Sequence, residues 1–121
     1  MNRKTISSLC LWGSRISAAL LLLFWGAFFI EHLTEWFSPS AIQPPLKVWL
    51  SMFFHLVMLA GLGIMVKWQR IGTCTMAFGT VAFYLGIGFH GFPYILLLNI
   101  IPAGFLGVYR QIKRNENSKS K

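Results

Sequence analysis

The chain has 121 residues, enough for one domain, and carries a net charge of +8, with eleven Lys and Arg against three acidic residues. Only 12% of its residues are charged, where a soluble domain has about a quarter. A basic chain can bind nucleic acid, but that function needs a basic face on a water-soluble fold and a recognition motif. Here the basic residues lie at the edges of apolar runs, so we expect no nucleic-acid partner.

Four apolar segments follow one another along the chain, and each is predicted to be a helix. The first covers residues 16–37, which as a helix would extend about 33 Å, enough to cross a hydrocarbon core of about 30 Å. A basic, polar segment at 1–15 precedes it. No small-residue cleavage site follows it, so the run is interpreted as an uncleaved helix rather than a signal peptide. The other predicted helices cover 46–66, 71–89 and 94–109.

These segments have the composition of membrane spans rather than of soluble core helices. A soluble helix needs a polar face, and residues 20–30 and 56–66 have none. Residues 16–109 are therefore predicted to form an all-α membrane domain, a four-transmembrane-helix bundle. The tail at 110–121 is polar and basic, so we expect it to be disordered and, like the segment at 1–15, to lie in the cytoplasm.

The basic residues predict which side of the membrane each end occupies, because cytoplasmic loops are enriched in Lys and Arg. Of the eleven, Lys47 alone lies on one side of the predicted spans. The other ten lie at the two ends of the chain and in the second connection. Trp and Tyr residues at both edges of the spans agree with this arrangement. We therefore expect an N-in/C-in topology.

Small residues spaced four apart let membrane helices approach closely, and two of the predicted helices contain such pairs. The pairs are Thr75/Gly79, Ala82/Gly86 and Ala103/Gly107. Together with Gly72 and Gly88, they predict that the third helix lies at the centre of the bundle. The alternative is that glycine is common in any membrane helix and the spacing carries no packing information.

Polar side chains are concentrated in the outer half of the predicted bundle, and all four helices contribute. They are Glu31, His32, Glu35, His55, His90 and Asn99. An acid at the centre of a membrane helix costs on the order of 3 kcal/mol, so such groups usually face the interior. The sequence therefore predicts an intramembrane polar cluster. Pro102, inside the fourth helix, predicts a helix kink.

Three functions remain open for this predicted cluster. The favoured one is structural, with hydrogen bonds that hold the helices together. The second is a path for protons or a small solute, in which Glu31 and His55 exchange a proton. The third is a bound metal or haem. The order His32-x-x-Glu35 reverses the Glu-x-x-His motif of di-iron sites, and His55 and His90 are at unequal depths, which argues against this third function.

Motifs for catalysis do not accompany these residues. The sequence contains no Gly-x-Ser-x-Gly, no phosphate-binding glycine loop and no His-Glu-x-x-His. We therefore expect a structural or accessory membrane protein rather than an enzyme, with no cofactor and no metal. The expected partners are the lipid bilayer and either a second copy of the chain or a host membrane complex, because so small a bundle has a thin interior.

Several residues and short motifs are distributed over the predicted helices and their connections. They are Arg15, Pro44-Pro45, His55-Leu56, Lys67-Trp68-x-x-Ile71-Gly72 and Pro102 with Gly107. On these residues the chain resembles, over roughly residues 12–108, a family of small uncharacterised prokaryotic four-helix transmembrane proteins, a domain of unknown function. Gln69 stands where that family has an acidic residue. The resemblance implies the four-helix fold and the bacterial cytoplasmic (inner) membrane, and it implies no activity, because the family has none assigned.

Overall fold

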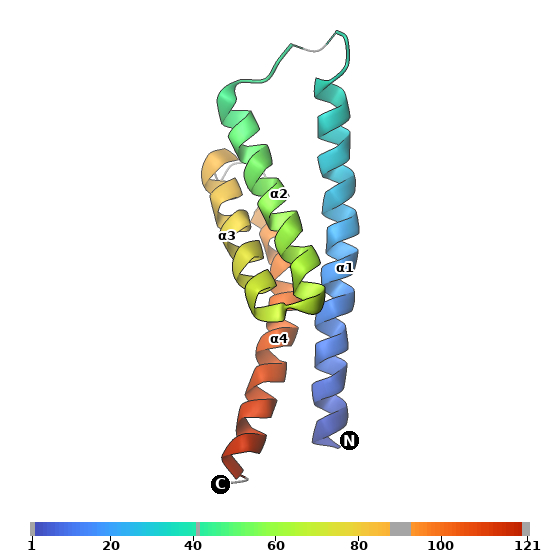
Figure 1. Cartoon of the computed structure of the whole chain (residues 1–121), viewed down its shortest axis with the longest axis vertical. Coiled ribbons are helices and arrows are strands. Elements are labelled where there is room, and N and C mark those ends of the chain that lie inside the picture. The colour runs from blue at the N-terminus through green and yellow to red at the C-terminus, as the bar shows by residue number, and fades with distance from the viewer. Residues whose placement is uncertain (1, 41, 88–92, 120–121) are drawn as a thin grey trace.

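The computed structural model describes residues 2–40, 42–87 and 93–119; for residues 87 and 93–96 the description is limited to the backbone. Within this part of the chain every regular element is an α-helix (Figure 1). The helices are α1 (Arg3–Trp36), α2 (Leu46–Lys67), α3 (Gln69–Ile87) and α4 (Pro93–Lys119). The all-α prediction is confirmed, and each helix contains most of one predicted apolar segment. Phe37 of the first segment lies just beyond α1, and residues 88 and 89 of the third lie outside the described residues.

The first helix is longer than its apolar run. α1 has 34 residues and begins at Arg3, so the predicted start at residue 16 is wrong and most of the segment at 1–15 is helical. Ser14 is buried against α4, and this contact holds the early turns of α1 in the fold. α1 ends at Trp36. It could not extend far beyond this residue, because Pro39 disfavours a helical conformation at Ser38.

A single non-helical residue, Trp68, joins α2 to α3. Its backbone leaves the helical region at φ −111° and ψ 80°. The Trp68 N–H still donates to the Ile64 carbonyl (2.7 Å), and the Trp68 carbonyl accepts from the Gly72 N–H (2.9 Å). Trp68 therefore continues the hydrogen bonding of both helices, and α2 and α3 form a tight antiparallel hairpin.

Glycines allow the two helices of this hairpin to touch backbone to backbone. Gly72 and Gly79 of α3 face the backbones of Met65 and Met58 in α2. A Cβ atom on either glycine would lie closer than 3.0 Å to those backbone atoms. Gly61 of α2 lies against the α3 backbone in the same way. Any larger residue at these positions would push the two helices apart, because backbone cannot rotate away as a side chain can.

The third helix lies at the edge of the bundle rather than at its centre. Its largest interface is with α2, its interface with α4 is small, and its described residues make none with α1. α1 packs on both α2 and α4 (Figure 1). The predicted central place of the glycine-rich helix is therefore wrong, because its glycines serve one close interface with α2. The predicted Ala103/Gly107 pair makes no such interface, since Gly107 has open space around it.

The fourth helix continues beyond its apolar part to Lys119. The tail predicted to be disordered at 110–121 is thus helical in its described residues, 110–119. This stretch contains no Gly or Pro and is rich in Arg, Lys, Gln and Glu, so the helix already formed by the apolar turns propagates through it. Both chain ends lie at the same end of the molecule, here termed the terminal end; the opposite end, which carries the α1–α2 connection, is termed the loop end (Figure 1).

Apolar side chains occupy both the interior and the surface. The core is formed by Ala18, Leu21, Trp25, Met58, Leu59, Leu62, Met65, Met76 and Leu106. Large apolar side chains are also exposed on every helix, as Phe24, Phe53, Phe78 and Phe105 illustrate. As far as the described residues go, two helices, α1 and α2, are long and apolar enough to cross a membrane.

Candidate functional site

Asn99 of α4 is a buried polar side chain that joins all four helices. Its Oδ1 accepts a hydrogen bond from Nε1 of Trp25 in α1 (3.2 Å). Its Nδ2 donates to Oγ1 of Thr80 in α3 (3.1 Å) and to Sδ of Met58 in α2 (3.2 Å). We term these four residues, whose side chains are between 3% and 5% exposed, the Asn99 junction.

The donors of the Asn99 junction all have acceptors. The Thr80 hydroxyl donates to the Met76 carbonyl (2.7 Å) while it accepts from Asn99, so each bond supports the next. A buried donor or acceptor left without a partner costs about 1–3 kcal/mol, and any shift of one helix would leave at least one such group. The junction therefore selects one arrangement of the four helices.

His55 of α2 is buried next to Trp25 of the Asn99 junction, among aromatic rings. Its ring centroid lies 5.9 Å from that of Trp25, 5.5 Å from that of Phe29 and 5.1 Å from that of Phe83. Nε2 of His55 is buried and has no hydrogen-bond partner among the described residues. Trp25 thus touches both buried polar groups, since its indole N–H binds Asn99 and its ring packs edge-on against His55.

The three polar residues predicted on the first helix do not enter the interior. Glu31, His32 and Glu35 are all exposed, and His32 contacts its own helix, with Nδ1 lying 2.9 Å from the Phe28 carbonyl oxygen. Glu31 lies about 120° around α1 from Trp25, which belongs to the inward face, and so points away from the interior. His32, seven residues after Trp25, lies on the inward side of α1 but remains exposed near the end of the helix. The prediction that they join one cluster with His55 and Asn99 is therefore wrong.

Of the six residues predicted for the cluster, the structure buries His55 and Asn99. His90 lies outside the described residues. Trp25 and Thr80 also belong to the buried polar set, but they were not predicted from the sequence. Trp25 carried a usable signal, because an indole N–H in the middle of an apolar helix, far from either end, needs a buried acceptor.

A second polar link joins α1 to α4 nearer the terminal end. The Ser14 hydroxyl donates to the Pro102 carbonyl at 3.0 Å, and both residues are buried. Next to it, Gly13 allows the Phe105 ring of α4 to approach, since a Cβ there would lie 3.3 Å from ring atoms. Pro102, for which a kink was predicted, therefore lies at a close contact between α1 and α4.

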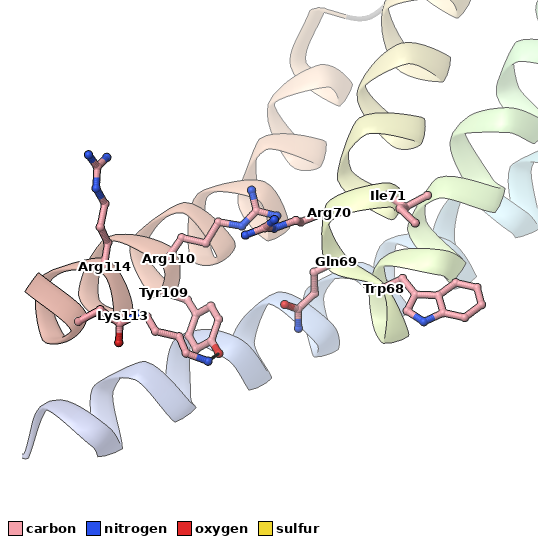
Figure 2. A pocket seen from close by; sticks show the side chains of 9 residues that line it. Trp68, Gln69, Arg70, Ile71, Tyr109, Arg110, Lys113 and Arg114 are labelled. Atoms are coloured by element: carbon pink, nitrogen blue, oxygen red, sulfur yellow. Dashed lines mark hydrogen bonds between the residues drawn. The ribbon is translucent and has the colours of Figure 1, made fainter.

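A basic cleft opens at the terminal end, below the α2–α3 turn and beside the last turns of α4. Its volume is about 790 Å³. Arg70 lines it from the start of α3, and Arg110, Lys113 and Arg114 line it from α4 (Figure 2). In Figure 2 the side chains of Arg70 and Arg110 extend toward one another. We term the opening that these four residues line the basic cleft.

The positive charge of the basic cleft is not neutralised within residues 2–40, 42–87 and 93–119. None of its four side chains has an ion pair there. Lys113 donates a hydrogen bond to the Tyr109 hydroxyl at 3.4 Å and lies over the Tyr109 ring. Four cations from two helices thus line the cleft.

Metal ligands do not gather in the part of the chain that the structure describes, where no group of three or more His, Cys, Asp or Glu side chains could hold an ion. The described residues therefore offer no set of ligands that supports the metal or haem hypothesis. Neither a family model, nor a curated protein, nor a solved structure matches the chain. The family resemblance therefore remains a prediction, and the function must be argued from the chain itself.

Proposed function

We propose that the chain is a non-catalytic protein of the bacterial cytoplasmic membrane, in which all four helices cross the bilayer and act as a structural or accessory component. The observation that carries this proposal is the distribution of side chains. Large apolar residues are exposed on every helix, while Asn99, Thr80 and His55 are buried. A helix bundle in lipid associates through close backbone contact and interior polar links, and the glycine interface and the Asn99 junction are examples of each.

The proposed topology places the terminal end in the cytoplasm. Arg3, Lys4, the α2–α3 turn and the helical tail of α4 all lie toward that end, and Lys47 lies toward the loop end (Figure 1). An excess of Lys and Arg marks the cytoplasmic side of a membrane protein. Trp36 and Trp49, whose rings lie 5.3 Å apart, support a membrane–water boundary at the loop end.

Membrane extraction and thiol labelling test this proposal. The protein should stay with membranes after an alkaline carbonate wash and need detergent for release. With Cys10 and Cys74 replaced by Ser, Gln43→Cys should react with an impermeant maleimide in intact cells, and Asn115→Cys only after the membrane is permeabilised. Recovery in a detergent-free aqueous extract would overturn the membrane proposal, and labelling of both sites in intact cells would overturn the topology.

The exposed acids of α1 support a further element of the proposal, a protein partner in the membrane. Glu31 and Glu35 lie on the outside of this helix, where contact with lipid would be costly. A second copy of the chain or a host complex would cover them. A protein that remains monomeric both in mild detergent and in lipid nanodiscs would contradict the second-copy form.

A second candidate function is proton transfer, and one observation favours it: Nε2 of His55 is buried and has no partner in the part of the chain that the structure describes. The candidate has less support, because Glu31, the other member of the predicted path, is exposed and no hydrogen bond joins it to His55. Vesicles that contain a pH-sensitive dye decide the question. Proton transfer requires faster acidification with wild type than with Glu31→Gln or His55→Phe. Equal rates in these variants and in the control Glu116→Gln would eliminate it.

A further inference from the structure

We propose that the basic cleft binds the phosphate headgroup of an anionic phospholipid, whose acyl chains lie along the outer face of α3. This inference rests on the proposed membrane location and goes beyond it by naming a ligand class and a site. Its first basis is charge. Arg70, Arg110, Lys113 and Arg114 line one opening and have no anionic partner among the described residues.

The geometry of the cleft suits a phosphate group in particular. Guanidinium groups present paired N–H donors that match phosphate oxygens, and three of the four cations are arginines. Gln69 and Arg70 form the first turn of α3, where backbone N–H groups have no acceptor within the helix and favour an anion. The opening is thus lined by side-chain charges from α3 and α4 and by the N-terminal turn of α3.

The position of the cleft suits a lipid rather than a free ion. It lies at the turn that ends α2, one of the two helices apolar enough to cross a membrane. Trp68 and Tyr109 both line it, and such aromatic side chains favour the membrane–water boundary. In the proposed topology this boundary is the cytoplasmic one, where basic pockets between helices bind anionic headgroups.

An exposed apolar stripe leads away from the cleft along α3. Ile71 lines the cleft and also begins the stripe, which continues through Phe78, Val81 and Leu85; the edge of the Phe78 side chain meets Phe54 of α2, and most of its surface stays exposed. The four side chains are between 58% and 68% exposed. A headgroup held by the arginines would place its acyl chains along this stripe. Inorganic phosphate would contact the cations but not the apolar stripe.

The test compares lipids on the purified full-length protein by native mass spectrometry and by its thermal stability in detergent. Wild type should retain phosphatidylglycerol in preference to phosphatidylcholine, and inorganic phosphate should neither displace it nor reproduce the stabilisation. Arg70→Gln/Arg110→Gln should weaken phosphatidylglycerol binding about 25-fold, at about fivefold for each charge removed. The control Arg3→Gln/Lys4→Gln removes the same charge outside the cleft and should keep the preference.

Three results would overturn the inference. They are equal retention of the two lipids by wild type, equal loss in the cleft and control variants, and displacement of the lipid by inorganic phosphate. If the double variant does not fold, Arg110→Gln alone should give about a fivefold loss, and no loss would count against the site. A protein that stays in carbonate-washed membranes but shows no lipid preference refutes only the cleft proposal, whereas release into an aqueous extract refutes the membrane proposal itself.

Discussion

Gly79→Ala should lower the free energy of unfolding by about 3 kcal/mol, although it adds only one methyl group. The new Cβ would lie 2.5 Å from the Met58 backbone nitrogen and 2.8 Å from its Cα. Neither atom can move without displacing α2, so the hairpin must separate along its length. Unfolding by sodium dodecyl sulfate in mixed micelles, followed by circular dichroism, measures the change.

Gly107→Ala is the matched control for this prediction. Gly107 lies in the interior of α4 with nothing within 4 Å of an added Cβ. Alanine there should leave stability unchanged or raise it by up to about 1 kcal/mol, because glycine is the poorer helix former. If Gly79→Ala and Gly107→Ala behave alike, the backbone-to-backbone contact of α2 and α3 does not exist in the protein.

Asn99→Leu should cost about 2 kcal/mol, the second largest expected effect. The substitution keeps a side chain of similar size but leaves the indole N–H of Trp25 buried without an acceptor. It also removes the side-chain hydrogen bonds from Asn99 of α4 to Thr80 and Met58 of the hairpin. The same unfolding titration measures the loss, and Asn115→Leu on the exposed tail should change stability by less than about 0.5 kcal/mol.

A double-mutant cycle separates the hydrogen bond from the loss of packing. Trp25→Phe removes the indole donor, so Asn99→Leu should cost less in its presence than in the wild type. The difference should be about 1 kcal/mol, within the range known for hydrogen bonds between membrane helices. Strict additivity of the two substitutions would show that Trp25 and Asn99 do not interact.

The sequence predicts the existence of the four helices well, because the apolar runs are long and prolines mark the connection between the first two. It predicts the ends poorly. Residues 3–15 and 110–119 are polar enough to suggest a terminal segment and a tail, yet each continues a helix that is already stable. Composition alone does not distinguish a polar helix end from a disordered tail.

The candidate site shows a different limit of sequence reasoning. The depth of a residue in a helix can be counted, which is why Asn99 and His55 were expected near one another. The direction of its side chain depends on how the helix rotates about its axis, and here the contacts of Ser14 and Trp25 with α4 set that rotation for α1. Glu31 shares the depth of these groups but points the other way.

Motion within the bundle is constrained by the spacing of the glycines of α3. Gly72 and Gly79 are seven residues apart, as are Met58 and Met65 opposite them, so the observed register satisfies both contacts at once and a slip of a single helical turn satisfies neither. A slip of one helical turn would bring Met58 against Thr75 or Phe83, and neither leaves room for it. Sliding of α3 along α2 is therefore blocked. We expect α2 and α3 to move as one rigid body. Relative motion of the helices should therefore take place at the interfaces of this body with α1 and α4.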